Sequence, residues 1–143
     1  METAASIIAV IQLTGSLVKI CGGYIKEVKD AKHEISALQQ TAISLEEALL
    51  SLKEYLHNSS DEHLPTFQIL RSDVARCGLV LMTLKEKIDP GKTTMRRLGL
   101  RSLKWPLKRQ EVHKAIQDLE RYKSSFTLHL QVDQTQVVFI FRT

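Results

Sequence analysis

The sequence predicts an all-α fold, an antiparallel four-helix bundle with an additional short helix in a basic connector. Apolar residues recur at spacings of three and four over four separate stretches, which is typical of helices that bury one face. Apolar residues make up 43% of the chain but aromatic residues only 6%, an inventory of Leu, Ile, Val and Ala that suits packed helices. A length of 143 residues is enough for one domain with a sizeable core and too short for two.

The first stretch, AASIIAVIQLTGSLVKICGGYI at residues 4–25, predicts a strongly apolar helix in which Lys19 is the only charged residue. Its inward-facing positions are expected to be Ile7, Val10, Thr14, Leu17, Cys21, Tyr24 and Val28. The apolar run could kink or turn at Gly22-Gly23 or at residues 30–32, and the residues alone do not choose between them. We prefer a turn near residue 31.

Two further stretches follow the same rule and predict the second and third helices. Their inward positions are Ile35, Leu38, Ala42, Leu45, Leu49, Leu52 and Leu56, then Phe67, Leu70, Val74, Cys77, Leu81, Leu84 and Ile88. Between them HNSSDEHLP, residues 57–65, supplies polar turn formers and a Pro suited to the first turn of a helix, and DPG at 89–91 ends the third helix. We expect these two helices to form an antiparallel pair.

The fourth helix is predicted by Val112, Ile116, Leu119, Tyr122, Phe126 and Leu130, with Leu107 and Ala115 on the same side. Before it, TTMRRLGLRSLKWP at 93–106 predicts a short helix or two turns, ended by Pro106. The one strand-like segment is VVFIF at 137–141. We therefore divide the chain into a helical bundle at residues 1–136 and a divergent apolar tail at 137–143.

The residues that could carry chemistry do not assemble into a site. Cys21 and Cys77 are isolated cysteines without a C-x-x-C motif or a His at ligand spacing, so neither a disulfide framework nor a zinc site is expected. GKTT at 91–94 resembles the end of a phosphate-binding loop, but the position five residues earlier is Glu86 rather than Gly. We expect no catalysis, no cofactor, no metal, and a reducing, cytoplasmic location.

The opening stretch fails as an export signal because its first charge is Glu2 rather than a basic cluster. Its uncharged part, Thr3 to Val18, would make about 24 Å of helix, short of the roughly 30 Å hydrocarbon core of a bilayer. Yet apolar residues also lie off the inward face, at Ile8, Ile11, Leu13, Val18 and Ile20. The helix is either buried among its neighbours or able to engage something else, and both hold if it can leave the bundle.

The segment from Lys92 to Arg109 contains seven Lys or Arg and no Asp or Glu. Alternating cations and apolar residues can lie at an anionic lipid interface, at about 1 kcal/mol per cation. The alternative is a solvated connector whose Trp105 plugs the end of the bundle. We do not expect nucleic acid as a partner, because only one aromatic residue interleaves with the cations and no binding motif is present. The candidate residues for contact with an anionic surface are Arg96, Arg97, Arg101, Lys104, Trp105, Lys108 and Arg109.

Two long segments carry a family resemblance: AASIIAVIQLTGSLVKICGGYIKEVKDAKHEISALQQTAISLEEALLSL at 4–52, and RSLKWPLKRQEVHKAIQDLERYKSSFTLHLQVDQTQ at 101–136. They resemble the N-terminal helical domain of fungal STAND proteins, also described from the azaphilone pigment cluster protein L and related to HeLo-like domains. The resemblance covers residues 2–136. Its most specific part is LKWP, followed by a basic pair and then LERYKS.

This resemblance implies a helical signalling domain without enzymatic activity, related to executioner domains that oligomerise and damage membranes through their first helix. Family members place it before a NACHT or NB-ARC module or before an effector enzyme. The chain departs from the pattern at VVFIFRT, which suggests a standalone or shortened member. Carried onto this chain, the expected membrane or self-association surface is Ile7, Ile8, Val10, Ile11, Leu13, Leu17 and Val18.

The function expected from these observations is self-association with like helical domains and engagement of anionic membranes, in regulated cell death or innate-immunity-type signalling. The protein would be cytoplasmic at rest and membrane-associated on activation. The alternative is a soluble interaction module that docks a partner's helices and never touches lipid.

Overall fold

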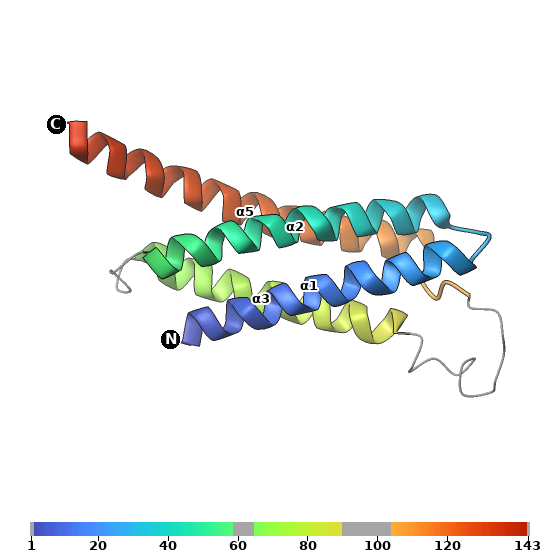
Figure 1. Cartoon of the computed structure of the whole chain (residues 1–143). Helices are drawn as coiled ribbons and strands as arrows, with labels where there is room; N and C mark the ends of the chain where they lie inside the picture. Colours follow the sequence, from blue (N-terminus) through green and yellow to red (C-terminus); the bar gives the residue numbers. More distant parts are fainter. Residues whose placement is uncertain (1, 59–64, 90–103, 143) are drawn as a thin grey trace.

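The computed structural model describes residues 2–58, 65–89 and 104–142. These residues form four helices, α1 (Glu2–Glu27), α2 (Lys32–Asn58), α3 (Pro65–Ile88) and α5 (Arg109–Arg142), and contain no strand. Successive helices run in opposite directions, and all four lie lengthwise in one bundle (Figure 1). The predicted all-α helical bundle is confirmed.

The turn between α1 and α2 lies at residues 28–31, close to the preferred position, and α1 continues through Gly22-Gly23 without a break. Ala31 has a φ of 64°, in the left-handed region that costs an L-residue roughly 1 kcal/mol. Its carbonyl accepts the first hydrogen bond of α2, from the amide of Ile35 at 2.9 Å. The turn is therefore tight and is made by a residue under backbone strain.

The ends of α3 and the start of α5 follow from local sequence. Pro65 is the first residue of α3, where its fixed φ suits a helix and its missing N–H is not needed. Lys85 and Lys87 in the last turn complement the helix dipole, and the helix ends at Ile88, before the predicted Asp-Pro-Gly stop. At the start of α5, the Lys108 amide donates to the Glu111 carboxylate at 3.1 Å, half of a capping box.

The core lies along the bundle axis and contains the predicted inward face of every helix. All of the predicted inward positions on α1 and α3 are buried, and so is Val28 just after α1. On α2 and α5 the predicted positions are buried too, except for Leu56, Ile116 and Leu130, which are partly buried. Leu107, just before α5, and Ala115 are also buried, as expected. The apolar periodicity therefore predicted which side of each helix faces inward.

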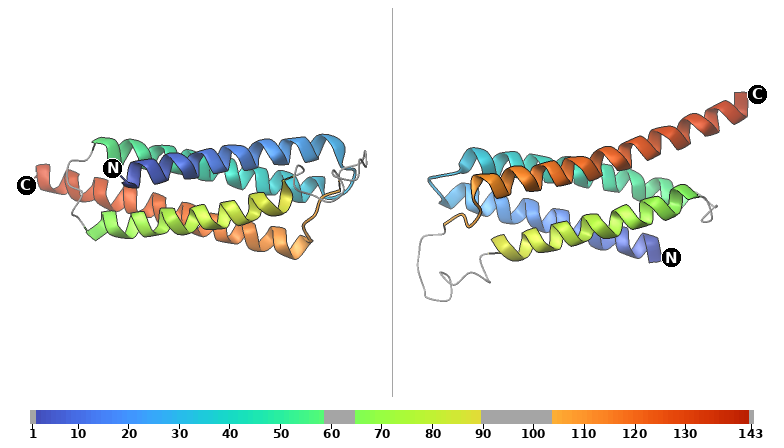
Figure 2. Two further views of the ribbon diagram at one scale, coloured as in Figure 1. Left: turned by 90° about the horizontal axis from the view of Figure 1, so that it is seen from below. Right: turned by 180° about the vertical axis from the view of Figure 1, so that it is seen from behind.

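The arrangement of neighbours differs from the expectation. α1 packs against α2 and α3, and α5 packs against the same two helices, so α2 and α3 lie diagonally opposite each other across the described bundle. They run antiparallel, but the prediction that they pair as neighbours is wrong. The parallel neighbours are instead α1 with α3 and α2 with α5 (Figures 1 and 2). α2 and α3 are not neighbours because α1 and α5 lie between them, and each of these two helices packs its apolar face against both.

The strand-like expectation for residues 137–141 is also wrong, because α5 runs on to Arg142. Extending a helix that has already formed needs no new nucleus, whereas a lone strand would have no partner. The end of α5 projects beyond the other helices (Figure 2). The expected short helix at 93–106 lies mostly outside the described residues, and residues 104–108, which are described, are not helical.

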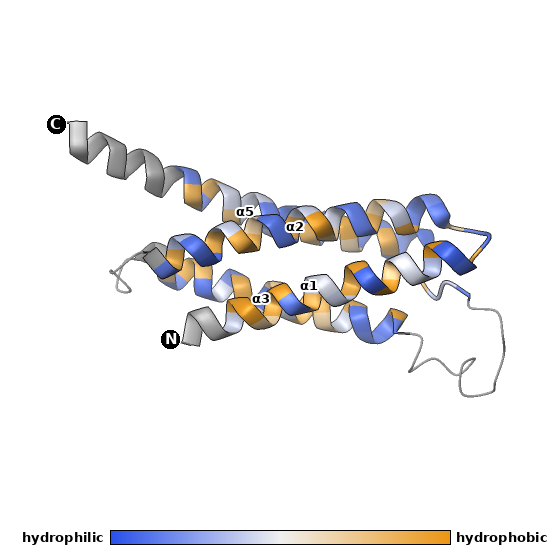
Figure 3. Ribbon diagram, in the orientation of Figure 1, coloured by the Kyte–Doolittle hydropathy of each residue, from blue (hydrophilic) through white to orange (hydrophobic). Residues whose placement is uncertain are grey.

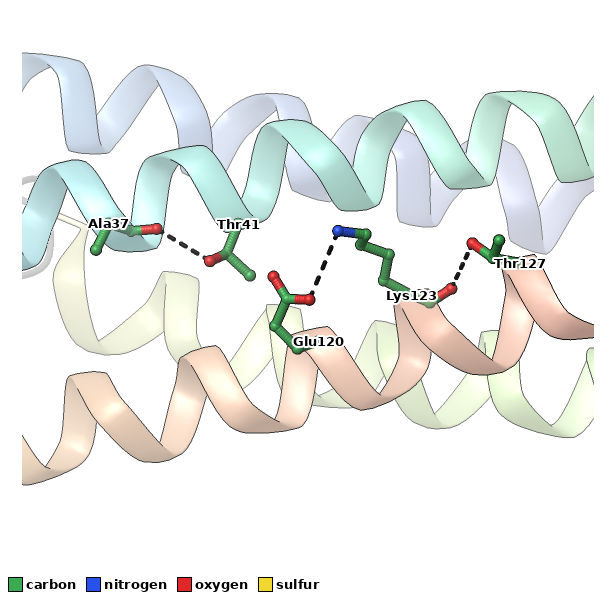
Figure 4. Close-up of polar contacts among 5 residues, drawn as sticks. All are labelled: Ala37, Thr41, Glu120, Lys123 and Thr127. Carbon is green, nitrogen blue, oxygen red and sulfur yellow. Dashed lines mark hydrogen bonds and ion pairs between the residues drawn. The ribbon is translucent and has the colours of Figure 1, made fainter.

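Polar residues near the contact between α2 and α5 are satisfied within their own helices (Figure 4). The buried Thr41 donates its hydroxyl to the carbonyl of Ala37 at 3.0 Å, and Thr127 donates to the carbonyl of Lys123 at 2.9 Å. Lys123 forms an ion pair with Glu120 one turn earlier, at 3.6 Å. For the buried Thr41 such a bond removes the cost of burying a hydroxyl, and the bonds of neither threonine link the two helices.

Candidate functional site

The candidate membrane surface of α1 is divided between the core and the exterior. Ile7, Val10 and Leu17 are buried in the bundle, whereas Ile11, Leu13 and Val18 are half-buried against it. Ile8 is 42% exposed. The structure therefore places these seven residues around much of the helix circumference rather than on one surface, and the hydropathy colouring shows apolar ribbon along much of α1 (Figure 3).

The helical length of α1 fits a bilayer better than the length of its uncharged part, Thr3 to Val18, had indicated. Residues Ser6–Glu27 form 22 helical residues that contain an 18-residue window with a mean hydropathy of 1.5, long and apolar enough to cross a membrane by length and composition alone. A core helix of a soluble bundle passes the same test. The uncharged part ends before Lys19, but a long basic side chain can extend its charge toward an interface, so the spanning helix can continue past this residue. Only 28% of the window is buried in the bundle.

Two polar side chains of α2 contact α1. The Gln39 amide donates to the backbone carbonyl of Val18 at 3.1 Å. Thr14, which is fully buried, donates to the carbonyl of Ile11 at 2.6 Å and lies 3.4 Å from a carboxylate oxygen of Glu46. Among the described residues, the side-chain hydrogen bonds between α1 and α2 are therefore one good bond and one long one.

α1 and α3 are in close contact at Val10 and Gly78. A Cβ built on Gly78 would lie 3.1 Å from a methyl carbon of Val10, so the absence of a side chain at this position permits the contact. At the other end of α1, the buried Tyr24 donates its hydroxyl to the carbonyl of Ile88 at 2.7 Å. This bond ties the last turn of α1 to the last turn of α3.

Trp105 covers that same end of the bundle. Its indole stands edge-on to the Tyr24 ring, with centroids 4.9 Å apart and planes at 83°. Its Nε1 is buried without a hydrogen-bond partner among the described residues. The interpretation of Trp105 as a plug of the bundle end agrees with this placement, and in this conformation the indole is not free to reach a lipid interface.

The basic segment is described only at its end. Arg96, Arg97 and Arg101 lie outside the described residues. Lys104, Lys108 and Arg109 are exposed, and Arg109 forms an ion pair with Glu34 of α2 at 3.6 Å. With three quarters of the Arg109 side chain exposed, this pair contributes little to stability. These cations lie at the end of the bundle where α1 ends and α5 begins (Figure 1).

A shallow apolar groove of about 310 Å³ lies between α3 and α5. Leu79, Leu84, Leu107 and Ala115 supply apolar surface, and Leu79 is 64% exposed. Charged side chains line it as well, with Lys87 of α3 paired across to Glu111 of α5 at 3.8 Å. The sequence analysis did not predict this groove, because it arises where α3 and α5 pack less closely than the other neighbours.

The two cysteines are buried thiols with weakened acidity. Burial raises the pKa of Cys21 to about 12, and burial together with the charge of Asp73 raises that of Cys77 to about 12. A thiol with such a pKa is almost wholly protonated at neutral pH and is a poor nucleophile. Within the described ranges, no group of three or more His, Cys, Asp or Glu is placed to hold a metal ion.

The contacts that hold α1 were missed by the sequence analysis. Gln39 and Glu46 had no motif that would single them out, since polar residues at helix surfaces are usually solvated. Their role depends on which helices are neighbours, which the periodicity of each helix does not specify. The inward positions of Tyr24, Thr14 and Ile88 were predicted, but the bonds that they form were not.

Comparison with known proteins finds no relative of this chain. No protein-family model matches the chain, and neither the curated proteins nor the solved structures contain a match. The fold and the arrangement around α1 therefore carry the functional argument.

Proposed function

We propose that this chain is a non-enzymatic helical signalling or effector domain, of the kind that precedes the nucleotide-binding module of fungal STAND proteins. It self-associates and engages anionic membranes in regulated cell death or innate-immunity-type signalling. It rests in the cytoplasm as a closed bundle and reaches a membrane on activation. The observation that supports this proposal is the apolar surplus of α1: an 18-residue apolar window within Ser6–Glu27 is 28% buried in the bundle.

The bundle and a bilayer would compete for the same side chains of α1. Ile7, Val10 and Leu17 are buried at rest, and burying a side chain of this size contributes about 1.5–3 kcal/mol wherever the apolar environment comes from. Ile8 is exposed, so a lipid phase would bury more of its apolar surface than the bundle does. A membrane therefore offers α1 more apolar contact than the bundle does.

Exposed cations support a preference for anionic lipid. Lys104 and Lys108 have no ion pair among the described residues, and each cation near an anionic surface contributes about 1 kcal/mol. The segment that carries them, residues 104–108, lies at the end of the bundle where α1 ends (Figure 1). Surface attraction would thus bring the bundle to the membrane before α1 engages it.

Dye release from liposomes containing anionic lipid tests the proposal. The key variant is Ile8→Gln, with Leu50→Gln on α2 as its matched control, because the two residues are 42% and 43% exposed. We expect Ile8→Gln to reduce leakage several-fold and Leu50→Gln to leave it unchanged. If the protein oligomerises without releasing dye, and deleting residues 2–20 changes nothing, the membrane part of the proposal is wrong.

The second candidate is a soluble adaptor module that docks a partner's helix. The groove between α3 and α5 favours it, because its apolar surface and exposed Leu79 resemble a helix-binding groove. Flotation with liposomes combined with sedimentation velocity separates the two functions. An adaptor stays at the bottom of the gradient with anionic vesicles, and Leu79→Glu then abolishes partner binding while Ile8→Gln does not.

A further inference from the structure

We infer that α1 is built in two parts joined by a hinge at Gly22-Gly23: residues 2–21 open away from the bundle while Tyr24 to Val28 stay fastened to it. The inference rests on the proposed function for its biological role, since the moving part carries the membrane-directed residues. Its structural basis is independent of lipid. Three observations locate the fastened part, the hinge and the moving part.

The fastened part is held by the buried polar contact of α1. Tyr24 is 1% exposed, and its hydroxyl reaches the Ile88 carbonyl at 2.7 Å. Trp105 packs edge-on against the same ring. Val28, the next inward position, is buried and donates its amide to the Tyr24 carbonyl at 2.9 Å. Opening this end would expose an aromatic pair and break a buried hydrogen bond at once.

The hinge is marked by two glycines that packing does not require. A Cβ on Gly22 would meet only the Gln39 amide nitrogen, at an ordinary 3.4 Å, and a Cβ on Gly23 would meet nothing within 4 Å. This differs from Gly78, where a side chain would press on Val10 at 3.1 Å. Gly22 and Gly23 therefore act through the backbone, by weakening the helix at two successive residues.

A side chain from α2 supports a break at the same turn. In an α-helix the carbonyl of Val18 accepts the hydrogen bond from the amide of Gly22. The Gln39 amide also donates to that carbonyl, at 3.1 Å. As the helix begins to bend at Gly22, the carbonyl keeps a donor, which lowers the cost of the first step. Side chains that insert into the helical hydrogen-bond ladder are a recognised cause of kinks.

The moving part has the weaker polar attachment. Among the described residues, the side-chain hydrogen bonds between this part and another helix are that of Gln39 with Val18 and that of Thr14 with Glu46, and the second is 3.4 Å long and only partly buried. The rest is apolar packing of Ile7, Val10, Leu17 and Cys21, which an apolar phase can replace. The boundary between weak and strong attachment falls between Cys21 and Tyr24, where the two glycines lie.

Thiol labelling without lipid tests the hinge. Cys21 is a native probe of the moving part when Cys77 is replaced by Ala, and Val28→Cys in a Cys21→Ala/Cys77→Ala background probes the fastened part; both sites are buried. We expect Cys21 to react about tenfold faster than Val28→Cys, with a smaller dependence on urea, because it opens without global unfolding. Equal rates with equal urea dependence would overturn the inference.

Substitution of the hinge supplies the second measurement. Gly22→Ala/Gly23→Ala fits the space available, and it should slow Cys21 labelling about tenfold toward the rate at residue 28, because opening must then also release Tyr24. Gly15→Ala is the matched control: it makes a similar 3.4 Å contact and lies within the moving part. If Gly15→Ala slows labelling as much as the hinge variant, the hinge is wrong.

The two proposals fail separately. Fast labelling of Cys21 without dye release from anionic vesicles would leave the hinge standing and refute the membrane function. Dye release by a protein whose Cys21 and Val28→Cys react at equal rates would refute the hinge and leave the membrane function standing.

Discussion

Tyr24 and Ile88 are joined by a hydrogen bond of 2.7 Å between residues 64 positions apart, and this bond closes the end of the bundle at which α1 and α3 both finish. A carbonyl in the last turn of a helix has no partner within the helix, so the tyrosine hydroxyl fills a place that water would otherwise take. The bond therefore both anchors α1 and caps α3.

Tyr24→Phe should lower the free energy of unfolding by about 1 kcal/mol, the usual net contribution of a buried hydrogen bond. Urea denaturation followed by circular dichroism measures it. Tyr122→Phe is the control, because Tyr122 is also buried and stacks on Phe126, but no hydrogen bond of its hydroxyl is found among the described residues. Equal losses for the two variants would mean that the bond to Ile88 contributes nothing.

Ala31→Gly should raise the free energy of unfolding by about 0.5–1 kcal/mol. Ala31 has a φ of 64°, which glycine adopts without steric cost. The same substitution at the exposed Ala37, inside α2, should instead lower it by about 1 kcal/mol, since glycine weakens a helix interior. Thermal and urea denaturation of the two variants thus give opposite signs, and a loss at both positions would contradict the strain assigned to Ala31.

Gly78→Ala should destabilise the native chain by about 1 kcal/mol, because its new methyl group presses on Val10, whose side chain is stiff in a helix. In a Val10→Ala background the same change should be neutral or stabilising, since the obstructing methyl is gone and alanine favours a helix. A double-mutant cycle by urea denaturation measures this coupling. Additive effects would show that the two helices do not meet at this pair.

The stability of the protein should fall as the pH rises above about 9. The thiols of Cys21 and Cys77 have an ordinary pKa of 9.0 and a pKa of about 12 in the folded chain, so between these values the unfolded chain loses protons that the folded chain keeps. The free energy of unfolding then decreases by up to about 1.4 kcal/mol per pH unit for each thiol. Urea denaturation at pH 8.5, 9.5 and 10.5 should show a flatter decline for Cys21→Ala/Cys77→Ala. Parallel curves for the two proteins would contradict the raised pKa values.

The inward face of each helix was predictable because burial imposes a spacing of three and four on the apolar residues. Even Thr14 fits, since its hydroxyl bonds to its own helix and leaves a methyl group for the core. The neighbour relations were not predictable in this way. An apolar face reveals that a helix is buried but not which helix it meets, and α2 and α3 were therefore wrongly paired.

The candidate site was predicted in its residues and not in its attachments. Ile8 and Ile11 off the inward face indicated an unusually apolar helix, which the structure places partly outside the core. The bonds from Gln39 and Tyr24 could not be predicted from the sequence, because each joins residues of different helices whose packing the sequence pattern does not specify. The strand predicted at VVFIF was wrong because β-branched and aromatic residues favour strands locally, whereas a helix that has already formed extends through them.

The diagonal placement of α2 and α3 has a consequence for how the chain folds. The bundle consists of two antiparallel helical hairpins, α1 with α2 and α3 with α5, set side by side. Each hairpin can form early from nearby residues, but contacts such as Tyr24 with Ile88 wait until the hairpins dock, so docking should be the slow step. At that step a hairpin can equally dock on the complementary hairpin of another chain, and a dimer with exchanged halves would be the expected product of refolding at high concentration.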